Sequence, residues 1–199
     1  MYIDDVIGTN KMQTMLDDLL SSSKFKNPED LLDNLNGVFR SPVNSGNVNS
    51  ASANNLYKEL EEGKYWMSQG DDVFISKKWS AGGNEVDVTI TTKNTLVECK
   101  NLSGNNLGSL VNDIIAKYTM ESKLSTAIKN QYPNHFGKIS ISNSSNEFYN
   151  LNKHQIINKF RQELLDKPGG IVKDKLVNSV KELHIENGQG RIIIKNSEW

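Results

Sequence analysis

Two short stretches of alternating polar and apolar residues constrain the fold of this chain more than any other feature. Residues 85–90 read Glu-Val-Asp-Val-Thr-Ile, and residues 96–100 read Leu-Val-Glu-Cys-Lys. Successive side chains of a β-strand point to opposite faces of its sheet. The Asp87 side chain therefore points to one face of its strand, and those of Val86 and Val88 point to the other. Glu98 shares one face of its strand with Lys100. We expect two adjacent strands that present two carboxylates and an ammonium.

The surrounding sequence predicts an α+β protein with a mixed sheet. Helical spacing of apolar residues predicts two helices within residues 1–40, the second beginning at Pro28, and another helix from about 53 to 69. We expect strands at 73–76, 85–92, 96–100, 138–141 and 191–195, and helices at about 108–130, 152–166 and 170–182. Short turns favour antiparallel pairing of the first three strands, and a crossover helix returns the fourth as a neighbour.

Composition divides the chain and limits its class. Residues 41–53 are small and polar throughout, which is typical of a linker. The sequence thus predicts a helical segment at 1–40, a linker at 41–53 and a main domain at 54–199. A single cysteine excludes an internal disulfide and a multi-cysteine zinc site. No apolar run reaches the roughly 18 residues that span a bilayer, so we expect no membrane span.

The carboxylates and the lysine together are suited to metal-dependent phosphodiester hydrolysis. Oxygen ligands favour Mg²⁺ or Mn²⁺, with Zn²⁺ as a further candidate. We expect Asp87 and Glu98 to bind the metal directly, and Cys99 to bind it through its backbone carbonyl. Lys100 would hold the nucleophilic water or a phosphate oxygen.

Asp87, a gap of ten residues and then Glu98-Cys-Lys100, on strands preceded by a helix, resemble the PD-(D/E)xK nuclease superfamily. The resemblance covers roughly residues 53–142, and Val86 stands where the family name has proline. It implies a restriction-endonuclease-like core of order α-β-β-β-α-β, here with an N-terminal helical extension and C-terminal accessory helices. It also implies an endonuclease that hydrolyses nucleic acid.

Many members of that superfamily add an acid from the first helix. Glu59, Glu61 and Glu62 compete for this role. Glu59 lies nearest the apolar stripe of the predicted helix, whereas Glu61 and Glu62 point further away. We choose Glu59, with Glu62 next; a charged helix face in solvent is the alternative.

The three histidines, His135, His154 and His184, show no metal-ligand spacing. We expect His154 and His184 to lie in amphipathic helices or at their ends, where surface or packing roles are the default. Trp66 and Trp79 read as core or cover residues.

The order of helical segment, linker and nuclease domain is similar to the C-terminal toxin regions of bacterial polymorphic and contact-dependent inhibition systems. This resemblance implies delivery into the cytoplasm of a neighbouring cell and a cognate immunity protein. DNA is favoured over tRNA because no aromatic cluster or basic arm indicates a folded RNA. A tRNA-cleaving toxin and a stand-alone restriction, phage or repair nuclease stay open. So do a non-catalytic nucleic-acid-binding module and a surface hairpin whose Glu98–Lys100 pair is a solvated edge.

Overall fold

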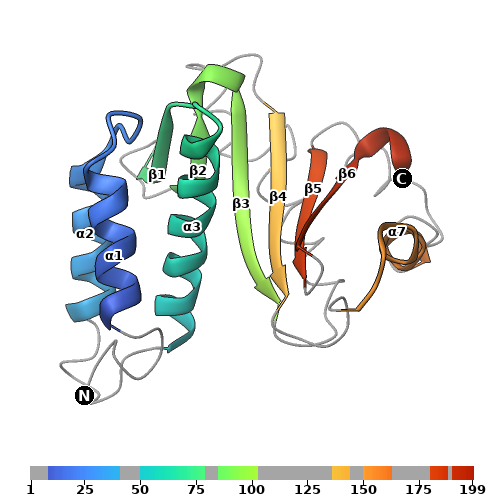
Figure 1. Ribbon diagram of the computed structural model, residues 1–199, viewed down its shortest axis with the longest axis horizontal. Coiled ribbons are helices and arrows are strands. Elements are labelled where there is room, and N and C mark those ends of the chain that lie inside the picture. Colours follow the sequence, from blue (N-terminus) through green and yellow to red (C-terminus); the bar gives the residue numbers. More distant parts are fainter. Residues whose placement is uncertain are drawn as a thin grey trace. The chain divides into compact units, whose positions relative to one another are not determined.

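The computed structural model describes residues 9–40, 50–78, 85–102, 136–143, 150–162, 180–187 and 190–199. The helices are α1 (Thr9–Leu20), α2 (Pro28–Arg40), α3 (Ser50–Ser68) and α7 (Lys153–Phe160), with short 3₁₀ turns η3 (Thr91–Lys93) and η5 (Asn196–Glu198). The strands are β1 (Val73–Lys78), β2 (Glu85–Ile90), β3 (Thr95–Leu102), β4 (Phe136–Asn143), β5 (Val180–Asn187) and β6 (Gly190–Lys195) (Figure 1). The chain divides into two compact units, Met1–Lys93 and Asn94–Trp199. The described part combines helices and sheet, as the α+β prediction requires.

In the first unit, β1 and β2 pair as an antiparallel hairpin. Val73 pairs with Ile90 and Ile75 with Val88, and all four side chains are fully buried. Helix α3 packs against this hairpin at Gly63. A Cβ atom at that position would lie 2.9 Å from Cγ1 of Ile75. The small residue therefore allows the helix to approach the sheet closely.

Helices α1 and α2 belong to the same unit. Helix α1 packs against α3, and α2 packs against β1. Their buried side chains follow the predicted helical spacing; they are Met12, Met15, Leu19, Leu31 and Leu35. Helix α2 begins at Pro28, as predicted.

The chain just before α2 is joined to β1 by backbone hydrogen bonds. The N–H of Val73 donates to the carbonyl of Lys24, and the N–H of Lys26 donates to the carbonyl of Val73, each at 2.9 Å. Asn27 continues this pairing with its side chain. Its Oδ1 accepts from the N–H of Ile75 at 2.9 Å, and its Nδ2 donates to the Ile75 carbonyl at 2.8 Å. These bonds integrate the N-terminal segment with the hairpin.

The predicted linker is too long at its C-terminal end. Helix α3 begins at Ser50, so residues 50–53 are helical. Small polar residues have only a weak preference against helix, and a helix with tertiary contacts further along can extend through them. The units divide between Lys93 and Asn94, outside the predicted 41–53 linker. Residues 41–49, the predicted turn at 80–84 and the predicted helix at 108–130 lie outside the described residues.

A mixed sheet of order β3-β4-β5-β6 forms the second unit (Figure 1). Strand β3 is parallel to β4 over all eight residues, and β4 is parallel to β5. Strand β6 then pairs antiparallel with β5. Parallel pairing is what crossover connections produce, in agreement with the expected return of the fourth strand as a neighbour of the third.

The helix predicted at 170–182 is wrong at its end, because residues 180–182 begin β5. Leu183, His184 and Ile185 are all buried, and β5 pairs on both sides, with β4 and β6, as an interior strand does. Short apolar runs do not distinguish a buried strand from a buried helix. Pairing with two neighbours therefore decides the structure here.

Helix α7 and the C-terminus pack together. Asn152 caps α7 by accepting from the N–H of Gln155. The rings of Phe160 and Trp199 lie 5.3 Å apart between centroids. Lys153 forms an ion pair with Glu198 at 2.7 Å. The side-chain bond from Lys153 is the main cause that lowers the pKa of Glu198 below its ordinary value.

Candidate functional site

Glu98 and Lys100 lie together on β3, as the alternation predicts. Nζ of Lys100 is 2.8 Å from Oε1 of Glu98. The Glu98 side chain is 1% exposed and that of Lys100 is 26% exposed. A carboxylate removed from water requires a compensating charge or hydrogen bonds, and the ammonium supplies one. The alternative of a solvated surface edge is wrong, because Glu98 is buried and β3 is paired with β4 along its whole length.

The neighbours of Glu98 on the other face of β3 are also buried. Val97 is 1% and Cys99 is 9% exposed. Because these residues alternate with Glu98 and Lys100, the Cys99 thiol lies on the face away from the ion pair. A metal contact of Cys99 would involve its backbone carbonyl, which stays a prediction.

Asp87 lies in β2 between two fully buried valines, Val86 and Val88, and is itself half-buried. In the β1–β2 ladder, Ile75 pairs with Val88 and Lys77 with Val86. Asp87 therefore occupies the position opposite Ser76. The hairpin thus fixes the backbone of Asp87 at the place that the sequence predicts.

Four residues form a contiguous polar face of α3: Lys58, Glu59, Glu62 and Trp66. Glu62 is fully buried and Lys58 is 2% exposed. The indole N–H of Trp66 donates to Oε1 of Glu62 at 2.8 Å, and Nζ of Lys58 is 3.9 Å from Oε2. The prediction that Glu62 points away from the buried side is wrong. The apolar stripe of the sequence indicates only one buried face of α3. In the structure, the polar face that carries Glu62 is buried as well.

Glu59 is held differently from Glu62. The hydroxyl of Ser76 donates to Oε2 of Glu59 at 2.6 Å. Glu59 remains half-buried, whereas Glu62 is enclosed and engaged by Trp66 and Lys58. This difference in access favours Glu59 over Glu62 as an acid that could contact a ligand.

Sequence reasoning gave no role to Lys58 or Ser76. A lysine one helical turn before a glutamate is the signal that could have revealed the Lys58–Glu62 pair. No sequence signal indicates the contact of Ser76, because it depends on the backbone conformation of β1.

A further set of polar contacts fixes the turn after β2. The Asp71 carboxylate accepts from Oγ1 of Thr92 at 2.9 Å and from Nζ of Lys93 at 2.6 Å. The same ammonium lies 5.0 Å from the centroid of the Trp66 ring. Turn η3 is therefore tied to α3 and to the start of β1, where the strand carrying Asp87 ends.

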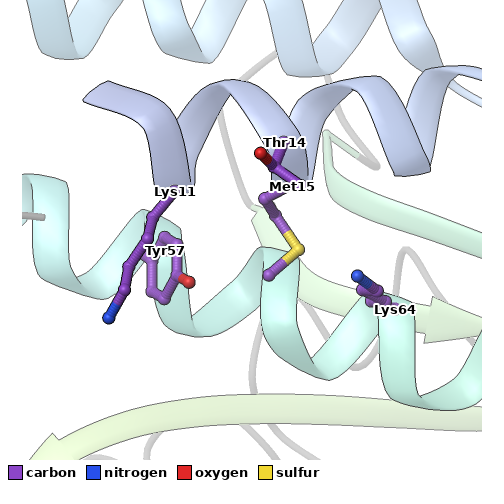
Figure 2. A pocket seen from close by; sticks show the side chains of 5 residues that line it. All are labelled: Lys11, Thr14, Met15, Tyr57 and Lys64. Atoms are coloured by element: carbon purple, nitrogen blue, oxygen red, sulfur yellow. The ribbon is translucent and has the colours of Figure 1, made fainter. Parts of the chain in front are cut away.

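A pocket between α1 and α3 lies among side chains other than the predicted site residues. It has a volume of about 320 Å³ and is lined by Lys11, Thr14 and Met15 from α1 and by Tyr57 and Lys64 from α3 (Figure 2). Burial is the main cause that raises the pKa of Tyr57 above its ordinary value. None of these lining side chains is a carboxylate, so the pocket lacks the acids that the predicted chemistry requires.

The two histidines of the described part lie on α7 and β5, elements other than those that carry the predicted acids. His154 lies exposed in α7, as predicted. His184 is 1% exposed and lies in β5, not in a helix, with Nε2 at 2.9 Å from Oε2 of Glu182. A packing role agrees with this position.

Comparison with models of known protein families, with curated proteins and with solved structures finds no match for this chain. Within the described ranges, no group of three or more His, Cys, Asp or Glu side chains is arranged to hold a metal ion. Among the same residues, no helix is long and apolar enough to cross a membrane.

Proposed function

We propose that this protein is a metal-dependent endonuclease that hydrolyses nucleic acid, with DNA as the favoured substrate. The observation that carries the proposal is the buried Glu98 carboxylate held 2.8 Å from the Lys100 ammonium on β3. Burying an ion pair is often neutral or costly compared with apolar packing. Such a buried pair is therefore better explained by chemistry than by stability.

The proposed roles follow from charge and access. Glu98 and Asp87 are the carboxylates that would bind a divalent cation, with Glu59 as an additional acid and the Cys99 carbonyl as a further oxygen ligand. This oxygen set suits Mg²⁺ or Mn²⁺, since Mg²⁺ retains several waters and needs only one or two protein carboxylates. A bound cation supplies an activated water and polarises the phosphate.

Lys100 has the exposure that its proposed role requires. About a quarter of its side chain remains accessible to solvent while its ammonium contacts Glu98. It can therefore hold a water molecule or a phosphoryl oxygen and stabilise the charge that develops on the phosphate. Lys100 therefore acts as an electrostatic and orienting group.

The fold supports a restriction-endonuclease-like core, which we propose for this chain. Helix α3 precedes an antiparallel hairpin, and a parallel pair, β3 and β4, follows. The described helix and the strands that follow it are compatible with the α-β-β-β-α-β arrangement that the motif implies, whose second helix would fall outside the described residues. We propose the setting implied by the same resemblance, a toxin that acts in the cytoplasm of a neighbouring bacterium and is neutralised by an immunity protein.

Thermal unfolding in the presence of Mg²⁺, Mn²⁺ or Zn²⁺ tests the metal site. A ligand that binds the folded state raises Tm by mass action, so we expect Tm to rise with metal concentration. In Asp87→Ala this increase should be lost. If no divalent cation changes the Tm of the wild type, the predicted metal site is absent and the proposal of a metal-dependent endonuclease fails.

A further inference from the structure

Ser76 has a backbone conformation that is unusual inside a strand. Its φ angle is +51°, in the left-handed region. Asn94, in the turn before β3, is the other non-glycine residue with a positive φ in the described part of the chain. Residues with a Cβ atom rarely adopt a positive φ, because the Cβ atom then lies too close to the backbone. Such strain persists only where the surrounding structure enforces it, and it is frequent at functional sites.

Side chains at the start of α2 and within it enforce this conformation. Asn27 binds both the N–H and the carbonyl of Ile75, at 2.9 and 2.8 Å, and is itself buried. Nδ2 of Asn34 donates to the carbonyl of Ser76 at 3.4 Å. The backbone on both sides of the Ser76 Cα is therefore anchored to the N-terminal helical segment.

The strained backbone changes the direction of the Ser76 side chain. In a regular strand, Ser76 would point away from the face on which Ile75 approaches Gly63 of α3. Instead, Ser76 also reaches α3, and its hydroxyl donates to Oε2 of Glu59 at 2.6 Å. This length is typical of a strong hydrogen bond from a hydroxyl to a charged carboxylate. Two successive residues of β1 thus contact the same helix.

We propose that Ser76 is a positioning residue for Glu59. Its hydroxyl fixes the orientation of the Glu59 carboxylate, to which the proposed function gives a role in metal-dependent hydrolysis, and α2 imposes the backbone geometry that makes the contact possible. The N-terminal helical segment is then part of the catalytic unit. This inference rests on the proposed nuclease function and on the role of Glu59 in it.

The experiment compares Ser76→Ala and Ser76→Gly with the wild type. Both variants lose the hydroxyl, but only glycine relieves the strain at a positive φ. A purely structural role predicts that activity follows stability, so that Ser76→Gly resembles the wild type. A positioning role predicts equal loss of activity in both variants, whatever their stability. Thr92→Val is a matched control, because it removes another hydroxyl bond to a carboxylate of the first unit, that of Asp71.

Cleavage rates are measured over a range of Mg²⁺ or Mn²⁺ concentrations, at a temperature where thermal unfolding shows every variant folded. We expect Ser76→Ala and Ser76→Gly to lose about 10- to 100-fold in kcat or in apparent metal affinity, the usual effect of removing an outer partner of a metal ligand. The Tm of Ser76→Gly should exceed that of Ser76→Ala. Thr92→Val should cleave at the wild-type rate.

The outcomes separate this inference from the function on which it rests. A wild type that cleaves nucleic acid, together with a Ser76→Gly variant of undiminished activity and metal affinity, overturns the positioning role alone. A wild type without cleavage and without metal-dependent stabilisation overturns both proposals.

Discussion

Replacing Lys100 by methionine removes the ammonium that lies 2.8 Å from the buried Glu98 carboxylate. Methionine has a similar length and packs well in irregular spaces, so the substitution changes mainly the charge. Breaking a buried ion pair by removing one partner typically costs about 3–5 kcal/mol. Because about a quarter of Lys100 is exposed and Glu98 has a further interaction, we expect a loss just below this range. The expected loss is about 2–3 kcal/mol, or roughly 5–10 °C in Tm for a chain of this length.

A divalent cation should reverse much of this loss if Glu98 is a metal ligand. The cation supplies the positive charge that the variant lacks, so the rise in Tm with Mg²⁺ or Mn²⁺ should be larger in Lys100→Met than in the wild type. Turnover should nevertheless be lost, because the metal does not replace the group that orients water or phosphate. Thermal unfolding with and without metal, followed by a cleavage assay, measures both effects.

Lys64→Met provides the matched control. Lys64 also forms an ion pair, with Asp18, but both side chains are nearly half exposed. Exposed pairs contribute less than about 1 kcal/mol, so this variant should unfold near the wild-type temperature and show the ordinary response to metal. A Lys100→Met variant as stable as Lys64→Met would refute the reasoning, since Glu98 would then not depend on its lysine.

Further variants test the packing and charge of each unit. Asn27→Ala leaves both backbone groups of Ile75 buried without their side-chain partner, so urea unfolding should show a loss of about 2–5 kcal/mol; a loss below about 1 kcal/mol would contradict the anchoring of β1. Gly63→Ala should lower the free energy of unfolding by about 1 kcal/mol. Crowding of the added methyl against Ile75 destabilises the fold by about 1–3 kcal/mol, and the higher helix propensity of alanine offsets part of this loss. Ile75→Val removes Cδ1, the atom nearest the added methyl, but keeps Cγ1, so it should restore part of the stability lost in Gly63→Ala. A double variant without any such recovery would refute the crowding. Glu198→Gln tests the carboxylate whose pKa is lowered by Lys153. The stability that this carboxylate contributes is fully present above its ordinary pKa of 4.5, and it is lost as the pH falls through the lower pKa of the folded state. Unfolding of wild type and variant should therefore differ at neutral pH and converge in acid, and a difference that persists in acid would contradict this.

The alternation of side chains was sufficient to predict the strands around the site. It places Glu98 with Lys100, and Cys99 on the opposite face, because the period of a strand is a strict geometric property. Pro28 and the spacing of the leucines after it predict the start and the buried face of α2 for the same kind of reason. These signals are local, and the structure confirms them.

Features that depend on contacts between distant parts of the chain could not be predicted in this way. The burial of Glu62 comes from a helix whose contacts extend beyond one apolar stripe. The conformation of Ser76 depends on side chains more than forty residues earlier in the chain. The prediction of a helix at 170–182 is wrong at its C-terminal end, because pairing with β4 and β6 makes residues 180–182 part of a strand. In each case tertiary contacts outweigh the local pattern.

Digestion of plasmid DNA and of total tRNA tests the central claim most directly. Each polymer is offered to the wild type and to Asp87→Ala in Mg²⁺, Mn²⁺ or Zn²⁺, with Lys64→Met as a folded control. We predict metal-dependent loss of the DNA with the wild type and the control, and none with Asp87→Ala. Cleavage of tRNA instead would keep the nuclease and change its substrate. Intact DNA and tRNA under all conditions, or equal cleavage by Asp87→Ala, would contradict the proposed function.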